Sequence, residues 1–212
     1  MSLHRSLAVA QTVPVPSDVD ANVEQHIALA HEAADRGAQL VVFPELSLTG
    51  YELDLSASLA FTSNDARLER LRAVADERSL QLIVGAPLRR DAELHIAAFV
   101  LSPGGATSLY TKRHLGAFGP DANPGGAVPP AEPTIFRPGN DDPLVACGTS
   151  VAAVAICADV GRPEHAERAH NRGARTYLAS MFVIPQDLRG EVRNLTTYAV
   201  RHHMTVAFAN YG

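Results

Sequence analysis

The sequence lacks the features that mark secreted, membrane or nucleic-acid-binding proteins. Its 212 residues contain only two cysteines, too few for a disulfide framework. No apolar stretch is long enough to cross a membrane, and residues 1–5 lead into an expected strand and not into a signal-peptide core. The net charge of -5 gives no basic footprint for nucleic acid. A basic amphipathic helix for a membrane surface is also missing.

What the sequence does contain is enough apolar material for one core. Hydrophobic residues make up 46% of the chain, and no linker divides it, so we expect one domain over residues 1–212. An expected hairpin turns near residues 148–149, just after Cys147. Cys157 then lies roughly 20 Å along the returning strand, at about 3.3 Å per residue. A disulfide needs Cα atoms within about 7 Å, so both thiols are expected to be free, as suits a reducing cytoplasm.

Strand and helix signals alternate along the chain. Periodicity and capping patterns predict helices over 17–36, from 63 or 64 to about 76, over 164–172 and over 188–203, the first with a capping box at Ser17 and Asp20. Strands are predicted at 7–13, 40–43, 81–87, 94–101, 106–111, in a hairpin over 144–157, at 176–180 and at 205–210. Helices combined with hairpins predict an α/β fold with mixed sheets and not a purely parallel barrel.

Cys157 stands where a strand gives way to a sharp turn and a helix. It ends the apolar run 151–156, and Pro163-Glu164 then begins the helix. Such a turn presents a thiol at the carboxyl end of a strand, where backbone N–H groups near Ala158 can face a developing oxyanion. The alternative is a buried core cysteine, because free cysteine is among the most buried residue types.

Two other charged residues also follow predicted strands. Glu45 comes after the apolar strand 40–43, where partial desolvation raises a carboxyl pKa toward the value that a general base needs near neutral pH. Lys112 comes at the end of the strand 106–111. Either residue alone is ordinarily a solvated surface charge. A carboxylate, an ammonium and a thiol, each at a strand end, are harder to explain in that way.

These three residues carry a resemblance to a known family. The settings Phe43-Pro44-Glu45, Tyr110-Thr111-Lys112-Arg113-His114-Leu115 and Cys157-Ala158-Asp159 resemble, in order and separation, the motifs of the nitrilase superfamily of carbon–nitrogen hydrolases. The resemblance covers nearly the whole chain. It implies a Glu–Lys–Cys triad, an αββα sandwich of two mixed β-sheets with helices on the outer faces, no metal or cofactor, and hydrolysis of a non-peptide C–N bond.

The resemblance also implies two supporting residues. Glu132 is similar to a second glutamate that many family members carry between the lysine and the cysteine, where it would orient Lys112 and the substrate. The alternative is an ordinary loop carboxylate. Tyr51 is similar to a family segment that lines the pocket, although an aromatic residue after a turn is often only packing. Asp159 and His114 are expected to be structural, and His202-His203 lacks metal-ligand spacing.

The sequence departs from the family pattern in two places. Ala158 and Gly161-Arg162 stand where an aromatic or acidic residue and Arg-Phe are usual. The chain stops at Tyr211-Gly212, where the family continues with further strands, so we expect a C-terminally short fold that is either truncated or completed by another chain.

The Gly- and Pro-rich segment 116–130 is expected to wall a pocket or to be a surface insertion.

Three functional hypotheses follow. The first is an amidase-type hydrolase that cleaves a small amide or carbamoyl compound through a thioester, with Lys112 lowering the Cys157 pKa. The second is a nitrilase acting on a nitrile, and the third is a non-catalytic binding or assembly protein. The resemblance also implies a homodimer formed by the helices over 164–172 and 188–203, beside the apolar link 181–184, which could equally be ordinary core.

Overall fold

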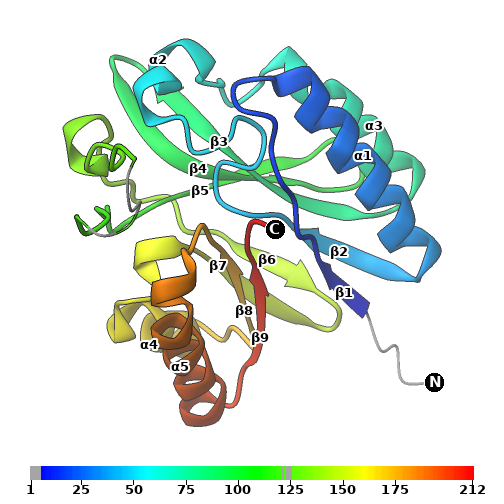
Figure 1. Ribbon diagram of the computed structural model, residues 1–212. Helices are drawn as coiled ribbons and strands as arrows, with labels where there is room; N and C mark the ends of the chain where they lie inside the picture. Colours follow the sequence, from blue (N-terminus) through cyan, green and yellow to red (C-terminus); the bar gives the residue numbers. More distant parts are fainter. Residues whose placement is uncertain (1–5, 121, 123–125) are drawn as a thin grey trace.

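Two β-sheets pack face to face between two layers of helices in the computed structural model (Figure 1), which describes residues 6–120, 122 and 126–212. The first sheet has the order β1-β2-β3-β4-β5, and the second has the order β6-β7-β8-β9. The strands of the first sheet are β1 (Ser6–Val9), β2 (Ala38–Val42), β3 (Gln81–Arg90), β4 (Glu93–Leu101) and β5 (Thr107–Thr111). Those of the second are β6 (Leu144–Cys147), β7 (Ser150–Ile156), β8 (Thr176–Ser180) and β9 (Thr205–Ala209).

Both sheets are mixed, as predicted. In the first sheet β1, β2 and β3 run parallel, while β3, β4 and β5 form antiparallel hairpins. In the second sheet β6 and β7 form a hairpin, and β7, β8 and β9 run parallel. The longer helices are α1 (Val19–Asp35), α3 (Glu69–Glu77), α4 (Pro163–Asn171) and α5 (Pro185–His202). Helices α1 and α3 cover the first sheet, and α4 and α5 cover the second (Figure 1).

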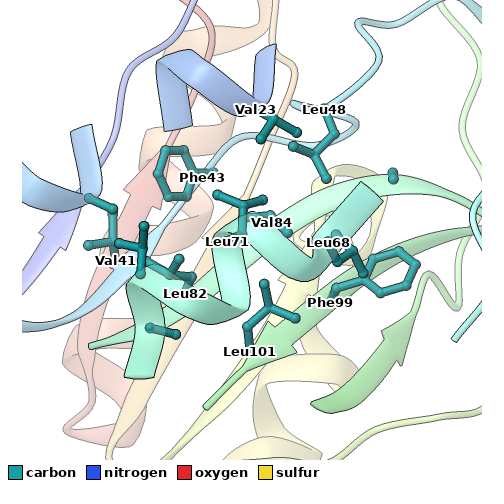
Figure 2. Packing of buried hydrophobic residues seen from close by; sticks show 14 of the residues in the cluster. Val23, Val41, Phe43, Leu48, Leu68, Leu71, Leu82, Val84, Phe99 and Leu101 are labelled. Carbon is teal, nitrogen blue, oxygen red and sulfur yellow. The ribbon is translucent and has the colours of Figure 1, made fainter. Parts of the chain in front are cut away.

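Alternating side chains divide the interior into three apolar layers. In β2, Leu40 and Val42 point between the two sheets, whereas Val41 and the following Phe43 face the helices. Figure 2 shows the layer between the first sheet and its helices, in which Val23 of α1 and Leu71 of α3 belong to one cluster with these strand residues. The middle layer therefore holds the sheets together.

Several predicted boundaries differ from the structure. The side chain of Asp18, and not a capping box at Ser17, accepts the N-terminal hydrogen bond of α1. Asp65 begins the turn before α3, one or two residues after the predicted cap. Helix α5 starts at Pro185 because proline suits the first turn of a helix. The short turns 53–55 and 56–59 were not predicted.

Candidate active site

The turn that carries Glu45 depends on a glycine in the neighbouring strand. After β2 ends, Leu46 adopts a φ of +51°. A Cβ atom on Gly85 of β3 would lie 2.4 Å from the Leu46 nitrogen and 2.8 Å from the Pro44 oxygen, so only glycine permits this close approach. Ser47 Oγ accepts a hydrogen bond from the Gly85 nitrogen at 3.2 Å. The turn is thereby held against β3, and the Glu45 side chain is fully buried.

Lys112, directly after β5, lies between two buried carboxylates. Its Nζ donates to Oε1 of Glu45 and to Oε1 of Glu132, both at 2.7 Å. Tyr51 donates its hydroxyl to the same Glu132 oxygen, and the Gly116 nitrogen donates to the other, both at 2.7 Å. The structure therefore brings Glu132 and Tyr51 to the predicted cluster, and Glu132 is a bonded partner of Lys112 and not an ordinary loop carboxylate.

The charges in this cluster shift each other's pKa values. Burial raises the pKa of Glu45 to about 7, against the opposing pull of Lys112. Burial also disfavours the charged form of Lys112, but Glu45, Cys157 and Glu132 outweigh it and raise the Lys112 pKa above its ordinary value. The lysine is therefore a permanent cation at neutral pH, while Glu45 is poised between its two protonation states.

Cys157 follows β7 at a strained elbow. Its φ is +41°, unusual for a residue with a side chain, and it begins a short 3-10 turn that ends at Asp159. The half-buried thiol lies 3.5 Å from the carbonyl oxygen of Phe182, which follows β8. Backbone strain of this kind is common where a side chain must be presented at a defined position.

Asp159 ties the cysteine elbow to the lysine turn. Its buried carboxylate accepts hydrogen bonds from the Ile156 nitrogen at 3.1 Å and from the Tyr110 hydroxyl at 2.7 Å. It also accepts from the His114 nitrogen at 2.9 Å, and the His114 ring lies at the same distance. The structural roles expected for Asp159 and His114 match these contacts.

The net pKa of the Cys157 thiol is not set by Lys112 alone. Lys112 does lower the pKa of Cys157, as predicted, but burial and the neighbouring Glu45 carboxylate raise it by more. The net pKa lies above the ordinary cysteine value. The resting thiol is consequently protonated at neutral pH, so any nucleophilic role requires a base that removes the proton during attack.

A cavity of about 150 Å³ lies over these groups. Residues from the two sheets, from the segment after Lys112 and from α5 line it: Tyr51, Lys112, Gly116, Ala117, Phe118, Glu132, Cys157, Ala158, Phe182, Val183, Asp187 and Glu191. The first part of the 116–130 segment thus walls the cavity, while residues 121 and 123–125 lie outside the described residues. A larger surface cavity beside Cys147 has no charged residue in its described lining.

Four lining residues were not predicted: Phe182, Val183, Asp187 and Glu191. The sequence could have indicated Phe182, because this residue follows the carboxyl end of β8 in the way that Cys157 follows β7. In the part of the chain that the structure describes, no group of three or more His, Cys, Asp or Glu side chains is arranged to hold a metal. The same residues include no helix with the length and apolarity needed to span a bilayer.

Comparison with known proteins places this site in a family. The family model described as carbon-nitrogen hydrolase matches residues 6–210. The chain belongs to the carbon-nitrogen hydrolase family. This confirms the resemblance to the nitrilase superfamily and identifies the protein as a carbon–nitrogen hydrolase.

Curated family members cover different reactions. A protein described as hydrolase in pqqF 5′ region, from Pseudomonas protegens, is 31% identical over 97% of this chain and 69% of its own length. The glutamine-dependent NAD(+) synthetase of Thermotoga maritima is 26% identical over 96% of the chain, which spans only 35% of that enzyme. An aliphatic nitrilase of Sinorhizobium fredii is 31% identical over 50% of the chain and 40% of its own length.

Solved structures of an amidase from Nesterenkonia sp. share the fold of this carbon–nitrogen hydrolase. One has a TM-score of 0.81 and 28% identity, and it covers 98% of this chain and 76% of the amidase. A mutant of that amidase shows the Michael addition of acrylamide at its active-site cysteine. The likeness confirms the predicted αββα sandwich.

Proposed function

We propose that this protein, as a single domain, hydrolyses the C–N bond of a small amide or carbamoyl compound and releases ammonia or an amine. The observation that carries the proposal is the placement of Lys112 between two buried carboxylates, beside a cavity that Cys157 also lines. The small size of this cavity suits a small substrate, because pockets for drug-sized ligands have volumes of about 300–1,000 Å³. No step of the proposed reaction calls for a metal or cofactor.

Glu45 is proposed as the general base. Its Oε2 atom is buried and holds no hydrogen bond among the described residues, and its pKa of about 7 suits proton transfer at neutral pH. The Cys157 side chain is close enough to act on that pKa. As Glu45 takes the thiol proton, the sulfur attacks the carbonyl carbon, and the C=O electrons move to the oxygen.

Lys112 and the Ala158 backbone N–H are proposed to stabilise the resulting oxyanion. When the oxyanion collapses, the C–N bond breaks and Glu45 returns the proton to the departing nitrogen, leaving a thioester on Cys157. Water then attacks the thioester carbon while Glu45 takes a proton from that water. The C–S bond breaks, Glu45 returns the proton to the sulfur, and the carboxylic acid leaves. Glu132, held by Tyr51 and Gly116, positions the lysine throughout and exchanges no proton.

Small electrophilic amides provide a direct test of the nucleophile. Fluoroacetamide leaves its acetamide moiety on the active-site cysteine of the related amidase mutant. In this chain we expect intact mass to show one adduct, on Cys157, in the wild type and in Cys147→Ala, and none in Cys157→Ala. Iodoacetamide is a poorer probe, because the raised pKa of Cys157 keeps its thiolate fraction low.

Turnover tests the reaction class. A nitrilase is the second candidate, because the chain partly matches the Sinorhizobium nitrilase. Measuring ammonia release from short primary amides, N-carbamoyl compounds and nitriles distinguishes the two activities. We expect ammonia from amides or carbamoyl compounds and none in Cys157→Ala. A protein that released ammonia from none of these compounds, and took up no fluoroacetamide, would be the non-catalytic binding or assembly protein.

We also propose a cytoplasmic homodimer formed through α4 and α5. Both cysteines are free, as suits a reducing compartment. Exposed apolar side chains on α5, namely Leu188, Val192 and Val200, provide a contact surface. Within the link 181–184, Met181 and Val183 are core residues and do not contribute to that surface. Light scattering at micromolar concentration tests the assembly, and a stable particle of one chain's mass would contradict it.

A further inference from the structure

Two carboxylates on α5 face the cavity without a cationic partner. Asp187 and Glu191 both line it and are four residues apart, which places them one turn apart on the same helix face. Like charges in this arrangement destabilise a helix. Glu191 accepts only a 3.4 Å hydrogen bond from Asn194, and among the described residues neither carboxylate has an ion pair. Arg189 and Arg193 lie about 200° around the helix from them, at 100° per residue.

Some other acidic residues of this chain have arginine partners. Asp142 pairs with Arg168 and Arg172 at 2.8 and 2.7 Å, and Asp141 pairs with Arg90 at 2.8 Å. Several exposed carboxylates elsewhere in the described part of the chain also have no ion pair, but Asp187 and Glu191 differ from them in lining the cavity that contains the proposed nucleophile. They add a feature to a site that Lys112 and Cys157 already define, and they do not define it themselves.

The cavity offers little positive charge to a ligand. Among the described residues, Lys112 is the only cationic residue that lines it, and both Glu45 and Glu132 accept hydrogen bonds from its ammonium. The remaining carboxylates, Asp187 and Glu191, have no ion pair among the described residues, although Asp187 lies in the first turn of α5, where the helix N-terminus favours negative charge. An anionic group on a substrate would meet uncompensated negative charge there, whereas a cationic group would complete the balance.

A cluster of three aromatic rings is a second feature of the cavity. Tyr51, Phe118 and Phe182 line the cavity and contact one another, with ring centroids 5.5 Å apart for Tyr51–Phe118, 4.6 Å for Tyr51–Phe182 and 5.6 Å for Phe118–Phe182. The faces of aromatic rings attract ammonium groups, and they also pack against a short alkyl chain. The combination of a ring cluster with two unpaired carboxylates is suited to an alkylammonium group.

We infer that the site is specific for short amides whose far end carries an ammonium group, held by Asp187 and Glu191 beside the three aromatic rings. This inference rests on the proposed amide hydrolysis and specifies its substrate class. The amide carbon lies at Cys157, the alkyl chain lies along Phe182, and the ammonium lies at the α5 side of the cavity.

The test compares three amides of similar length. In 4-aminobutanamide and pentanamide an ammonium replaces a methyl group at equal heavy-atom count, while succinamic acid carries a carboxylate. We expect kcat/KM for 4-aminobutanamide to exceed that for pentanamide about tenfold or more at low salt, with succinamic acid last. The preference should shrink as ionic strength rises, because salt screens the carboxylates at a partly open site.

Charge-neutral variants locate the preference. In the double variant Asp187→Asn/Glu191→Gln, the ratio of kcat/KM for 4-aminobutanamide to that for pentanamide should fall about tenfold, and each single variant should lose part of it. Glu77→Gln, which removes an exposed carboxylate from α3, should leave the ratio unchanged. Circular dichroism confirms that each variant is folded.

The outcomes separate this inference from the proposed function. Hydrolysis of pentanamide without preference for the cationic amide, or a preference that survives in the double variant, overturns the inference alone. No ammonia from any of the three amides, together with no fluoroacetamide adduct, overturns the proposed hydrolysis and the inference with it.

Discussion

Replacing Lys112 by methionine would leave two carboxylates in the interior without their cation. Methionine has nearly the length of lysine and no polar head, so the change removes the charge without opening a large cavity. Lys112 and Glu45 have no exposed side-chain surface, and Glu132 has 2%. These groups are therefore shielded from bulk solvent, which can compensate only weakly for the lost ammonium.

The expected loss is large compared with the stability of a typical domain. Removing one partner from a buried ion pair costs about 3–5 kcal/mol, and two carboxylates share this lysine, so we expect the upper end of that range. Natural domains have free energies of unfolding of about 5–15 kcal/mol. The Lys112→Met protein should accordingly be only marginally folded at pH 8.

The loss should depend on pH with a definite sign. Without Lys112, the pKa of Glu45 in the folded state rises further above its unfolded value, starting from about 7. The folded variant then holds protons more tightly than the unfolded chain. The penalty is therefore complete above the folded pKa and shrinks as the pH falls toward the unfolded value.

Urea unfolding followed by circular dichroism at pH 8 and pH 5.5 measures this. We expect a deficit of about 3–5 kcal/mol relative to wild type at pH 8 and a clearly smaller one at pH 5.5. Adding Glu45→Gln and Glu132→Gln, which removes the stranded charges, should recover about half of the pH 8 deficit and abolish its pH dependence. A deficit below about 1 kcal/mol, or one equal at both pH values, would refute the buried ion-pair reasoning.

Further predictions concern the base and the turn that carries it. Glu45→Gln should lower kcat/KM about 10²- to 10⁴-fold, and retention of a tenth of the activity would exclude the base assignment. In the wild type, kcat/KM should rise with pH through about 7, because the base acts in its ionised form; a profile flat from pH 5.5 to 8.5 contradicts this. Gly85→Ala should destabilise the protein by about 1–3 kcal/mol or more and lower activity. Gly190→Ala, with open space in α5, should be neutral or stabilising in the same unfolding assay.

The sequence predicted those features of the site that depend on where strands end. Glu45, Lys112 and Cys157 each follow a strand whose apolar pattern is local, so their order and position were visible without coordinates. The net pKa of Cys157 was not, since it depends on how burial and Glu45 together compare with Lys112. The faces of helices near the cavity were also hidden. The sequence alone could not assign Asp187 and Glu191 to the site, because their position at the cavity depends on how α5 packs against it.

The division of the site between two sheets has a consequence for biosynthesis. Glu45 and Lys112 belong to the five-stranded sheet made from the first half of the chain, whereas Cys157 follows a strand of the second sheet. A nascent chain emerging from the ribosome can thus build the lysine–glutamate half before the thiol has been synthesised. The nucleophile meets its base only when the second sheet docks, so a half-folded chain has no assembled reactive centre. The appearance of activity during folding would then mark the docking of the second sheet onto the first.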